Sequence, residues 1–260
     1  MLKLIKCEFW KLKRKRFVSF VIFSALLFPI PFTALVLKGS LGSINAFDGL
    51  FGMLITIGEQ IMLPAILGII AAMLFFMERD NNTLKNLRTI PVSPGKIATA
   101  KIAILFILGL IYSLVTVASA MVGGFIAGSS VGNVFYKLWL SAVTSVLYTA
   151  GTLPVVIAIV FFNRSYIFSI ILTFFYTMFD FSLAYTGLAS QAPVMKLLTS
   201  VMPAPIIYRW LVSQFVSKDA AFYSVIQPYF LSLPLVILII AVLGGLSYFA
   251  IIKIYSKRES

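Results

Sequence analysis

The sequence predicts an all-α polytopic membrane protein, and three observations carry that prediction. Of the 260 residues, 61% are hydrophobic, whereas a soluble domain has about 45–50% apolar residues. Several uninterrupted apolar runs exceed the roughly 18 residues that mark a membrane-crossing helix. The runs are continuous, unlike the short alternating segments of a transmembrane β-barrel. We therefore expect a bundle of helices whose apolar side chains face lipid as well as one another.

The apolar runs divide into six expected spans within a single transmembrane domain, residues 1–260. The first run follows a basic segment, as the apolar region of a signal peptide does, but it is longer than such a region and no small-residue cleavage site follows it. We therefore expect it to be retained as a span. The six expected spans cover residues 17–37, 53–77, 97–127, 134–162, 166–185 and 229–252.

The basic residues set the expected orientation. The chain has 21 Lys and Arg against 8 Asp and Glu, a net charge of +13. With the N-terminus inside the cell, 16 basic residues fall in cytoplasmic segments and 5 in outer segments, which is the positive-inside bias of membrane proteins. We expect both termini in the cytoplasm. The lipid bilayer, whose inner leaflet is anionic, is then the partner of this charge, and no nucleic acid is expected.

An interfacial amphipathic helix is expected before the first span, over residues 1–16. Leu2, Ile5, Phe9 and Leu12 recur at helical spacing, with basic residues between them. A helix with one apolar edge and a basic face is typical of a segment that lies along a membrane surface.

The hydrophilic segment between the second and third spans, residues 78–96, stands out from the other connections. Residues 83–90 are predicted to form a helix of about two turns, with Leu84 and Leu87 on one edge and a proline that stops it. The Ser93–Pro94 pair is predicted to cap and begin the next helix. A helix this short is stabilised by docking its apolar side chains into a groove. The alternative is a loop that lies on lipid headgroups.

A second unusual segment, residues 186–228, lies on the expected outer side and is too apolar for a solvated loop. Its two apolar pieces, 194–202 and 206–216, are separated by prolines and are too short to cross a membrane. Tyr208 and Trp210 suit the outer belt of aromatic residues at lipid headgroups. We expect a re-entrant helical hairpin that dips into the outer leaflet.

Two acidic residues, Glu59 and Asp180, interrupt apolar stretches and are candidates for a substrate path, because an ionisable group inside a membrane is costly. Glu59 lies 19 residues before Glu78, which places it about 28 Å from the inner surface at the helical rise. Asp180 is also expected in the outer half of the membrane. If the chain transports a compound, Asp180 would meet a cationic part of that compound. The alternative for both is an interfacial acid that is solvated or paired with Arg209.

The sequence lacks the residues of most catalytic sites. There is no His and one Cys, Cys7, which excludes an intramolecular disulfide and any His-based triad and argues against structural zinc. The Gly95–Lys96 pair lacks the preceding glycine of a phosphate-binding loop. We therefore expect no enzyme and no cofactor or metal on this chain. Any ATP dependence must come from a separate partner.

Two motifs carry a resemblance to a known family. The first is the N-terminal segment Glu8-Phe9-Trp10-Lys11-Leu12-Lys13-Arg14. The second is the 78–96 segment, which opens on an acidic residue and continues Thr-Leu-Lys-x-Leu and Pro-Val-Ser. With six spans and a re-entrant outer segment, the chain resembles permease subunits of type-2 ATP-binding-cassette exporters. Within them it resembles the small permeases that confer self-protection against lantibiotics and bacitracin.

The resemblance implies a working unit and a set of coupling residues. Two copies of a cytoplasmic ATP-binding-cassette ATPase, with ATP and Mg²⁺, would serve two permeases that are the same chain or paralogues, in the plasma membrane of a bacterium. A lipophilic or amphipathic compound would be exported. The residues expected to contact the ATPase are Glu78, Thr83, Leu84, Leu87 and Arg88 of the 78–96 segment, and Glu8 and Lys11 of the N-terminal helix.

The main alternative is a stand-alone secondary transporter or channel. Such a protein is expected to show internal repeats and a relay of buried acids, and the two halves of this sequence do not match. A non-transporting assembly or sensor protein is a third reading.

Overall fold

In the computed structural model the described residues are all helical or irregular, and none of them forms a strand. They are residues 1–13, 23, 33, 45–80, 92–162, 165–187, 190, 192–218 and 223–259, without the side chains of 77–80 and 258–259. Five of the helices are long and apolar enough to cross a membrane. The polytopic helical class is thereby confirmed. The predicted first span, 17–37, lies outside the described residues except at Phe23 and Thr33.

The described helices follow one another along the chain. In order they are α1 (Leu2–Lys13), α4 (Ala46–Met53), the π-helical segment η1 (Leu54–Met62), α5 (Leu63–Asp80), α7 (Pro94–Ile126), α8 (Val134–Phe162), α9 (Tyr166–Thr186), α10 (Pro193–Val201), α11 (Pro203–Phe215), α12 (Tyr223–Ile226), the 3₁₀ turn η2 (Gln227–Tyr229) and α13 (Leu233–Glu259).

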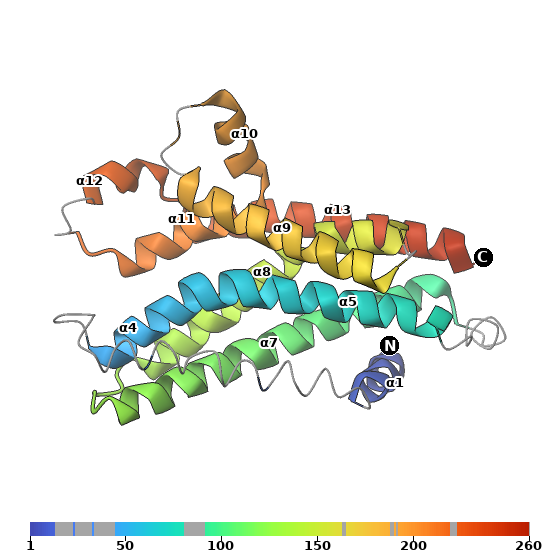
Figure 1. Ribbon diagram of the computed structural model, residues 1–260, viewed down its shortest axis with the longest axis horizontal. Coiled ribbons are helices and arrows are strands. Elements are labelled where there is room, and N and C mark those ends of the chain that lie inside the picture. Colours follow the sequence, from blue (N-terminus) through green and yellow to red (C-terminus); the bar gives the residue numbers. More distant parts are fainter. Residues whose placement is uncertain are drawn as a thin grey trace.

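The long helices run side by side, and both ends of the described chain lie toward the same end of the bundle (Figure 1). The α4–η1–α5 rod, α7, α8, α9 and α13 form the bundle. Helix α1 lies at the end where α5 finishes and α13 ends, whereas α10, α11 and α12 lie towards the other end. We call the first of these the loop end, because the 78–96 segment joins α5 to α7 there. Its cytoplasmic location stays a prediction.

One helix start confirms a local capping prediction, and the end of the same helix shows a termination that was not predicted. Ser93 is the N-cap of α7 and Pro94 its first residue, as the sequence predicted. At the other end of α7, Gly128 adopts a φ of 69°. The amides of Gly128 and Ser129 bond to the carbonyls of Phe125 and Gly124, at 3.0 Å each. This is a Schellman termination, which favours glycine at the left-handed position.

Two predicted span boundaries are wrong. The second span begins at Ala46 rather than residue 53, because the Asn45 side chain caps the helix by accepting a hydrogen bond from the Phe47 amide at 3.0 Å. The last helix begins at Leu233 and continues to Glu259 rather than covering 229–252. Basic residues near a helix C-terminus are favourable, so the polar tail extends the helix.

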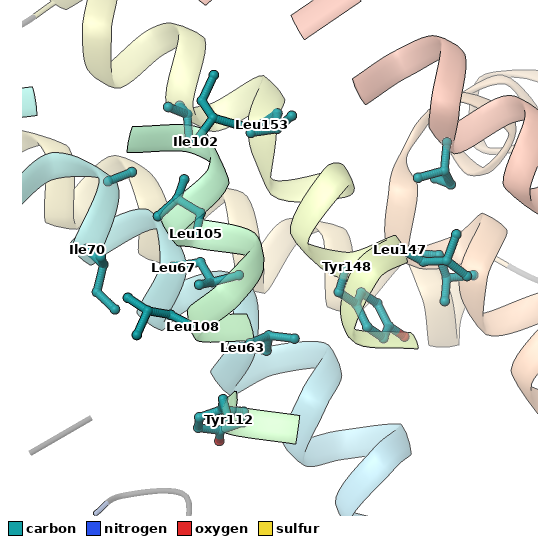
Figure 2. Packing of buried hydrophobic residues seen from close by; sticks show 14 of the residues in the cluster. Leu63, Leu67, Ile70, Ile102, Leu105, Leu108, Tyr112, Leu147, Tyr148 and Leu153 are labelled. Atoms are coloured by element: carbon teal, nitrogen blue, oxygen red, sulfur yellow. The ribbon is translucent and has the colours of Figure 1, made fainter. Parts of the chain in front are cut away.

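The core lies where α5, α7 and α8 meet (Figure 2). Leu67 of α5, Leu105 of α7 and Tyr148 of α8 are among its buried side chains. Glycines let neighbouring helices approach closely. A Cβ placed on Gly68 of α5 would lie 2.2 Å from a methyl carbon of Thr173 of α9, so the two helices touch where no larger residue fits.

The segment between α9 and α13 contains the two short helices expected there, α10 and α11. The boundary between them and the surroundings of Trp210 differ from the prediction. Pro203 begins α11 rather than separating the pieces, since proline is tolerated in the first turn of a helix. Trp210 is buried, with 3% of its surface exposed, so its predicted place among lipid headgroups is wrong. It packs in the protein core, while Tyr208 is half-buried. Whether this hairpin dips into a leaflet stays a prediction.

Candidate functional site

A buried ion pair joins α1 to the bundle at the loop end. The Glu8 side chain is 6% exposed and that of Lys101, on α7, is 1% exposed. Lys101 Nζ donates to Glu8 Oε2 at 3.1 Å. On the accessible side of α1, Lys11 also pairs with Glu8 and keeps 31% of its side chain exposed. The single carboxylate of Glu8 therefore serves one buried and one accessible cation.

Lys101 also contacts α5. Lys101 Nζ donates to the carbonyl of Leu74 at 2.6 Å and lies 5.8 Å from the centroid of the Phe75 ring, within the range of a cation–π interaction. The apolar edge of α1 supports this arrangement because Leu12 is buried against the bundle, although Leu2 is 83% exposed. Three elements, α1, α5 and α7, thus meet at one ammonium group.

The interior of the bundle holds a second polar cluster, centred on Glu59 in η1. Glu59 has no exposed surface. Its Oε1 accepts hydrogen bonds from Ser113 Oγ of α7 at 2.6 Å and from Ser141 Oγ of α8 at 2.9 Å. Its Oε2 accepts from Thr144 Oγ1 of α8 at 2.7 Å. Glu59 is therefore neither solvated nor paired with Arg209, and it links η1 to two long helices.

Four more buried residues near this cluster carry polar side chains. Gln60 follows Glu59 in the sequence, and Ser145, Tyr148 and Thr149 follow Thr144 along α8. Both side-chain atoms of Gln60 have no hydrogen-bond partner within the described structure. The same holds for the hydroxyls of Ser145, Tyr148 and Thr149. Ser145 and Thr149 face Gly109 of α7, since a Cβ on that glycine would lie 2.5 Å from Thr149 Oγ1 and 3.2 Å from Ser145 Oγ.

Asp180 of α9 holds the start of α11. Both of its carboxylate oxygens accept from the amide of Ala204, at 3.1 Å each. Pro203 has no amide hydrogen and the N-cap residue, Met202, makes no side-chain cap, so Asp180 supplies the acceptor that the α11 N-terminus lacks. An acidic group at this place is also favoured by the helix dipole. Arg209 instead donates to Thr199 Oγ1 at 3.1 Å.

An apolar groove of about 400 Å³ lies between α7, α8 and α13. Its lining contains no charged side chain and Trp139 is its one aromatic residue. The lining residues are Leu110, Trp139, Ala142, Val143, Val146, Leu147, Ala150, Ile237, Ile240 and Ala241.

A model of the family described as ABC-2 family transporter protein matches residues 4–180. The chain belongs to this ABC-2 family. The match runs from α1 into the last turns of α9, so it contains Glu8, Lys101, Glu59 and Asp180. A comparison with curated proteins finds no match for the chain.

As an ABC-2 permease, the protein is a multi-pass membrane component of an ABC transporter, and the family implies an ATP-binding-cassette ATPase as its partner. Transport rather than catalysis is the role of such a component. The lantibiotic and bacitracin branch is a finer assignment, which the family match leaves open.

The predicted coupling residues of the ABC-2 permease are placed only in part. Glu8 and Lys11 lie at the loop end, as does the backbone of Glu78 in the last turn of α5. The other four predicted residues lie outside the described residues: Thr83, Leu84, Leu87 and Arg88. Most of the Glu8 carboxylate is buried inside the permease, so its contact with Lys101 is internal. Its role towards the ATPase stays a prediction.

Sequence reasoning missed the partners of the buried acids in the ABC-2 permease. From the sequence alone, Lys101 is one of the 16 basic residues that set the expected orientation of the spans. In the structure it bonds to Glu8, which lies 93 residues earlier in the chain. A signal for the Glu59 cluster was present. Ser141, Ser145 and Tyr148 of α8 recur every three or four residues, and Thr144 stands beside Ser145, which places polar groups along one face of an otherwise apolar helix.

Proposed function

We propose that the chain is the permease of an ATP-driven exporter that moves a lipophilic or amphipathic compound out of a bacterial plasma membrane. An antimicrobial peptide of the lantibiotic or bacitracin kind is the cargo class that the sequence resemblance favours. The working unit consists of two permeases, identical or paralogous, and two ATPase subunits that carry ATP and Mg²⁺.

The observation that carries this proposal is the Glu8–Lys101 junction at the loop end. The 78–96 segment joins α5 to α7, and Lys101 bonds both to α5 through the Leu74 carbonyl and to α1 through Glu8. A displacement of the segment would therefore be passed to three helices together. A buried, paired charge resists separation because breaking it leaves an uncompensated charge.

The mechanism follows from this linkage. The ATPase binds the helix predicted over residues 83–90 through Leu84 and Leu87, and closure of the ATPase pair pushes this segment. The push enters α5 and α7 at their joined ends, and α1 moves with them through Lys101. Tilting of the bundle then changes which surfaces face the two sides of the membrane, and the cargo leaves on the outer side.

The apolar surfaces of the bundle support a lipophilic cargo and a second permease. The groove between α7, α8 and α13 has an apolar lining that suits a hydrocarbon group. Helix α9 presents exposed Ile167, Ile171, Phe174 and Phe175, a face that lipid or a second permease can cover. Asp180 and Glu59 remain the proposed polar positions on the substrate path.

Crosslinking tests the proposal. Cysteines at Leu84 and Leu87 are introduced one at a time into a Cys7→Ser background, because Cys7 is exposed. The complex is purified with its ATPase, and a cysteine-reactive crosslinker is added. We expect both positions to crosslink to the ATPase, whereas cysteine at Phe135, which is 90% exposed near the opposite end, does not.

Absence of any crosslink at Leu84 and Leu87 in an intact complex would show that the segment does not dock on the ATPase. Transport by the purified chain without any ATPase would favour the alternative of a secondary transporter. A dependence of the ATPase activity of the partner on this chain supports the exporter.

A further inference from the structure

The Glu59 cluster contains more hydrogen-bonding contacts than hydrogens. Four contacts join its four side chains: Ser113 to Glu59, Ser141 to Glu59, Thr144 to Glu59, and Ser113 to Ser141. The three hydroxyls supply three hydrogens, and an ionised carboxylate supplies none. All three hydroxyls also lie close to backbone carbonyls. Ser113 lies 2.8 Å from that of Ser141, Thr144 lies 2.9 Å from those of Leu140 and Ser141, and Ser141 lies 3.3 Å from that of Ser113. With an ionised carboxylate, the three hydroxyl hydrogens serve the three contacts to Glu59, and the contact between Ser113 and Ser141 is left without a hydrogen.

We propose that Glu59, Ser113, Ser141 and Thr144 form a binding site for a proton, which Glu59 carries. With a fourth hydrogen on the carboxyl group, each of the four side-chain contacts holds one hydrogen. The protonated carboxyl donates to a serine hydroxyl, and the remaining hydroxyls donate around the cluster. The ligand of this site is H⁺, and the site lies inside the bundle, distant from the ATPase-facing loop end.

The charge environment supports a neutral carboxyl group. The ion pairs Lys11–Glu8, Lys101–Glu8 and Lys137–Asp48 do not involve Glu59, and Glu59 has no basic partner among the described residues. An unpaired ionised carboxylate in an apolar interior is costly, and such a group is held neutral instead. Burial is complete, so no water from the surface offsets that cost.

The other titratable groups near Glu59 do not supply a positive charge. Within the described part of the chain, the titratable groups that face it or its segment include four tyrosines: Tyr112 from α7, Tyr148 from α8, Tyr185 from α9 and Tyr208 from α11. The Tyr185 hydroxyl donates to the Thr56 carbonyl at 3.4 Å, and the Tyr208 ring packs at a tilt against the Tyr185 ring. On α4 the acid is Asp48, which pairs with Lys137. The charged residues of α5 (Glu78, Arg79 and Asp80) all lie in its last turn, 19 or more residues after Glu59. Asp180 of α9 accepts from the Ala204 amide, and Arg209 of α11 donates to Thr199.

The spacing of the oxygens favours a proton over a metal ion. Hydroxyl and carboxylate oxygens are 2.6–2.9 Å apart, which is the ordinary length of an O–H···O hydrogen bond. Oxygens that share a metal ion at bond lengths of about 2.0–2.6 Å are held about 3 Å or more apart. The cluster is therefore packed for hydrogens.

The bound proton acts as a lock between helices. Ser113 belongs to α7, Ser141 and Thr144 to α8, and Glu59 to η1. Loss of the proton would leave an ionised carboxylate in the interior without a counter-charge, and the Ser113–Ser141 contact without a hydrogen. This favours any arrangement that separates these helices or admits water. By linkage, a motion that opens the cluster releases the proton, and a rise in pH favours the motion.

Infrared spectroscopy tests for the proton directly. The full-length chain, in detergent, is measured at neutral pH in H₂O and D₂O for the carbonyl stretch of a protonated carboxylic acid. We expect the band in the wild type and in Asp180→Asn, which removes the other buried acid of the spans, and its loss in Glu59→Gln. If Glu59→Gln does not fold, Glu59→Asp supplies the assignment, because it keeps the acid and shifts the band. Absence of the band from the wild type, or its survival unchanged in a folded Glu59→Gln protein, would overturn the proposal.

A pH series gives a second readout. The unfolded chain holds Glu59 in water, where the carboxyl is already ionised at neutral pH. The proton bound in the folded state therefore stabilises it, and this stabilisation is lost as the pH rises through the point of release. We expect the melting temperature of the wild type to fall with rising pH more than that of Glu59→Gln, which carries its hydrogens at every pH. Equal slopes, or a melting temperature that rises with Na⁺ at constant ionic strength, would contradict a proton site.

Discussion

The Glu8 carboxylate of α1 accepts a hydrogen bond from the Lys101 ammonium of α7 at 3.1 Å, with both side chains almost fully buried. This contact ties the N-terminal helix to the spans joined by the predicted docking segment. The structure therefore gives α1 an internal partner, whereas its amphipathic sequence alone predicted only a place along the membrane surface.

We expect Lys101→Met to destabilise the permease by about 3 kcal/mol, because removing one partner of a buried ion pair leaves the other charge uncompensated. The double variant Glu8→Gln/Lys101→Met should recover much of that loss. Melting temperatures in detergent measure both. Lys3→Met, at an exposed position of the same helix, is the control and should change little. If the double variant loses as much as the two single variants together, the residues are not coupled.

The close contact of α5 and α9 predicts that a second substitution restores the stability lost through the first. Gly68→Ala places a Cβ 2.2 Å from the Thr173 methyl carbon and 2.8 Å from its hydroxyl oxygen, so overpacking should cost about 1–3 kcal/mol. Thr173→Ala removes both of those atoms and should restore most of the melting temperature. Gly245→Ala in α13 has no atom within 4 Å of its new Cβ and serves as the control. A Gly68→Ala variant as stable as the wild type would contradict the packing.

Two substitutions of Asp180 distinguish a structural role, as the acceptor for α11, from a role in contacting the transported compound. Asp180→Asn keeps an oxygen that accepts from the Ala204 amide, whereas Asp180→Leu removes it and should cost about 1 kcal/mol, as the loss of a helix cap does. Both variants are compared for melting temperature and for transport of a cationic peptide. Normal transport by a stable Asp180→Asn protein means that the charge does not meet the cargo. Selective loss of transport in that variant supports the substrate path.

The Lys137 ammonium lies 3.7 Å from the centroid of the Phe47 ring and donates to the Gly132 carbonyl at 3.1 Å, besides pairing with Asp48. The Asp48 side chain is 55% exposed, so its ion pair is screened by water. We expect Lys137→Met to lower the melting temperature more than Asp48→Asn does. A larger effect of Asp48→Asn would show that the exposed ion pair, rather than the ring and the carbonyl, holds Lys137.

The positions of the described long helices were predicted well from the sequence. Some of their ends were predicted correctly and others were not. The span from Val134 to Phe162 has its predicted bounds, and the Ser93–Pro94 start of α7 follows from local backbone chemistry. The start at Ala46 was missed because Asn45 stands in a stretch that is only moderately apolar, where its cap outweighs hydropathy. Trp210 was placed at the headgroups by residue type, but α11 packs back onto the bundle.

Local properties of the sequence determined that this chain is a helical membrane protein. Apolar length, capping residues and charge asymmetry act over a few residues, and each can be read without knowing what lies beside it. Only the tertiary structure decided what the buried acids do. Glu8 meets a residue 93 positions away, Glu59 meets three that are 54 or more positions away, and Asp180 meets one 24 positions away. A buried carboxylate must find its hydrogens or its counter-charge wherever the packing of other helices brings them, and that pairing is not written in any single stretch of the chain.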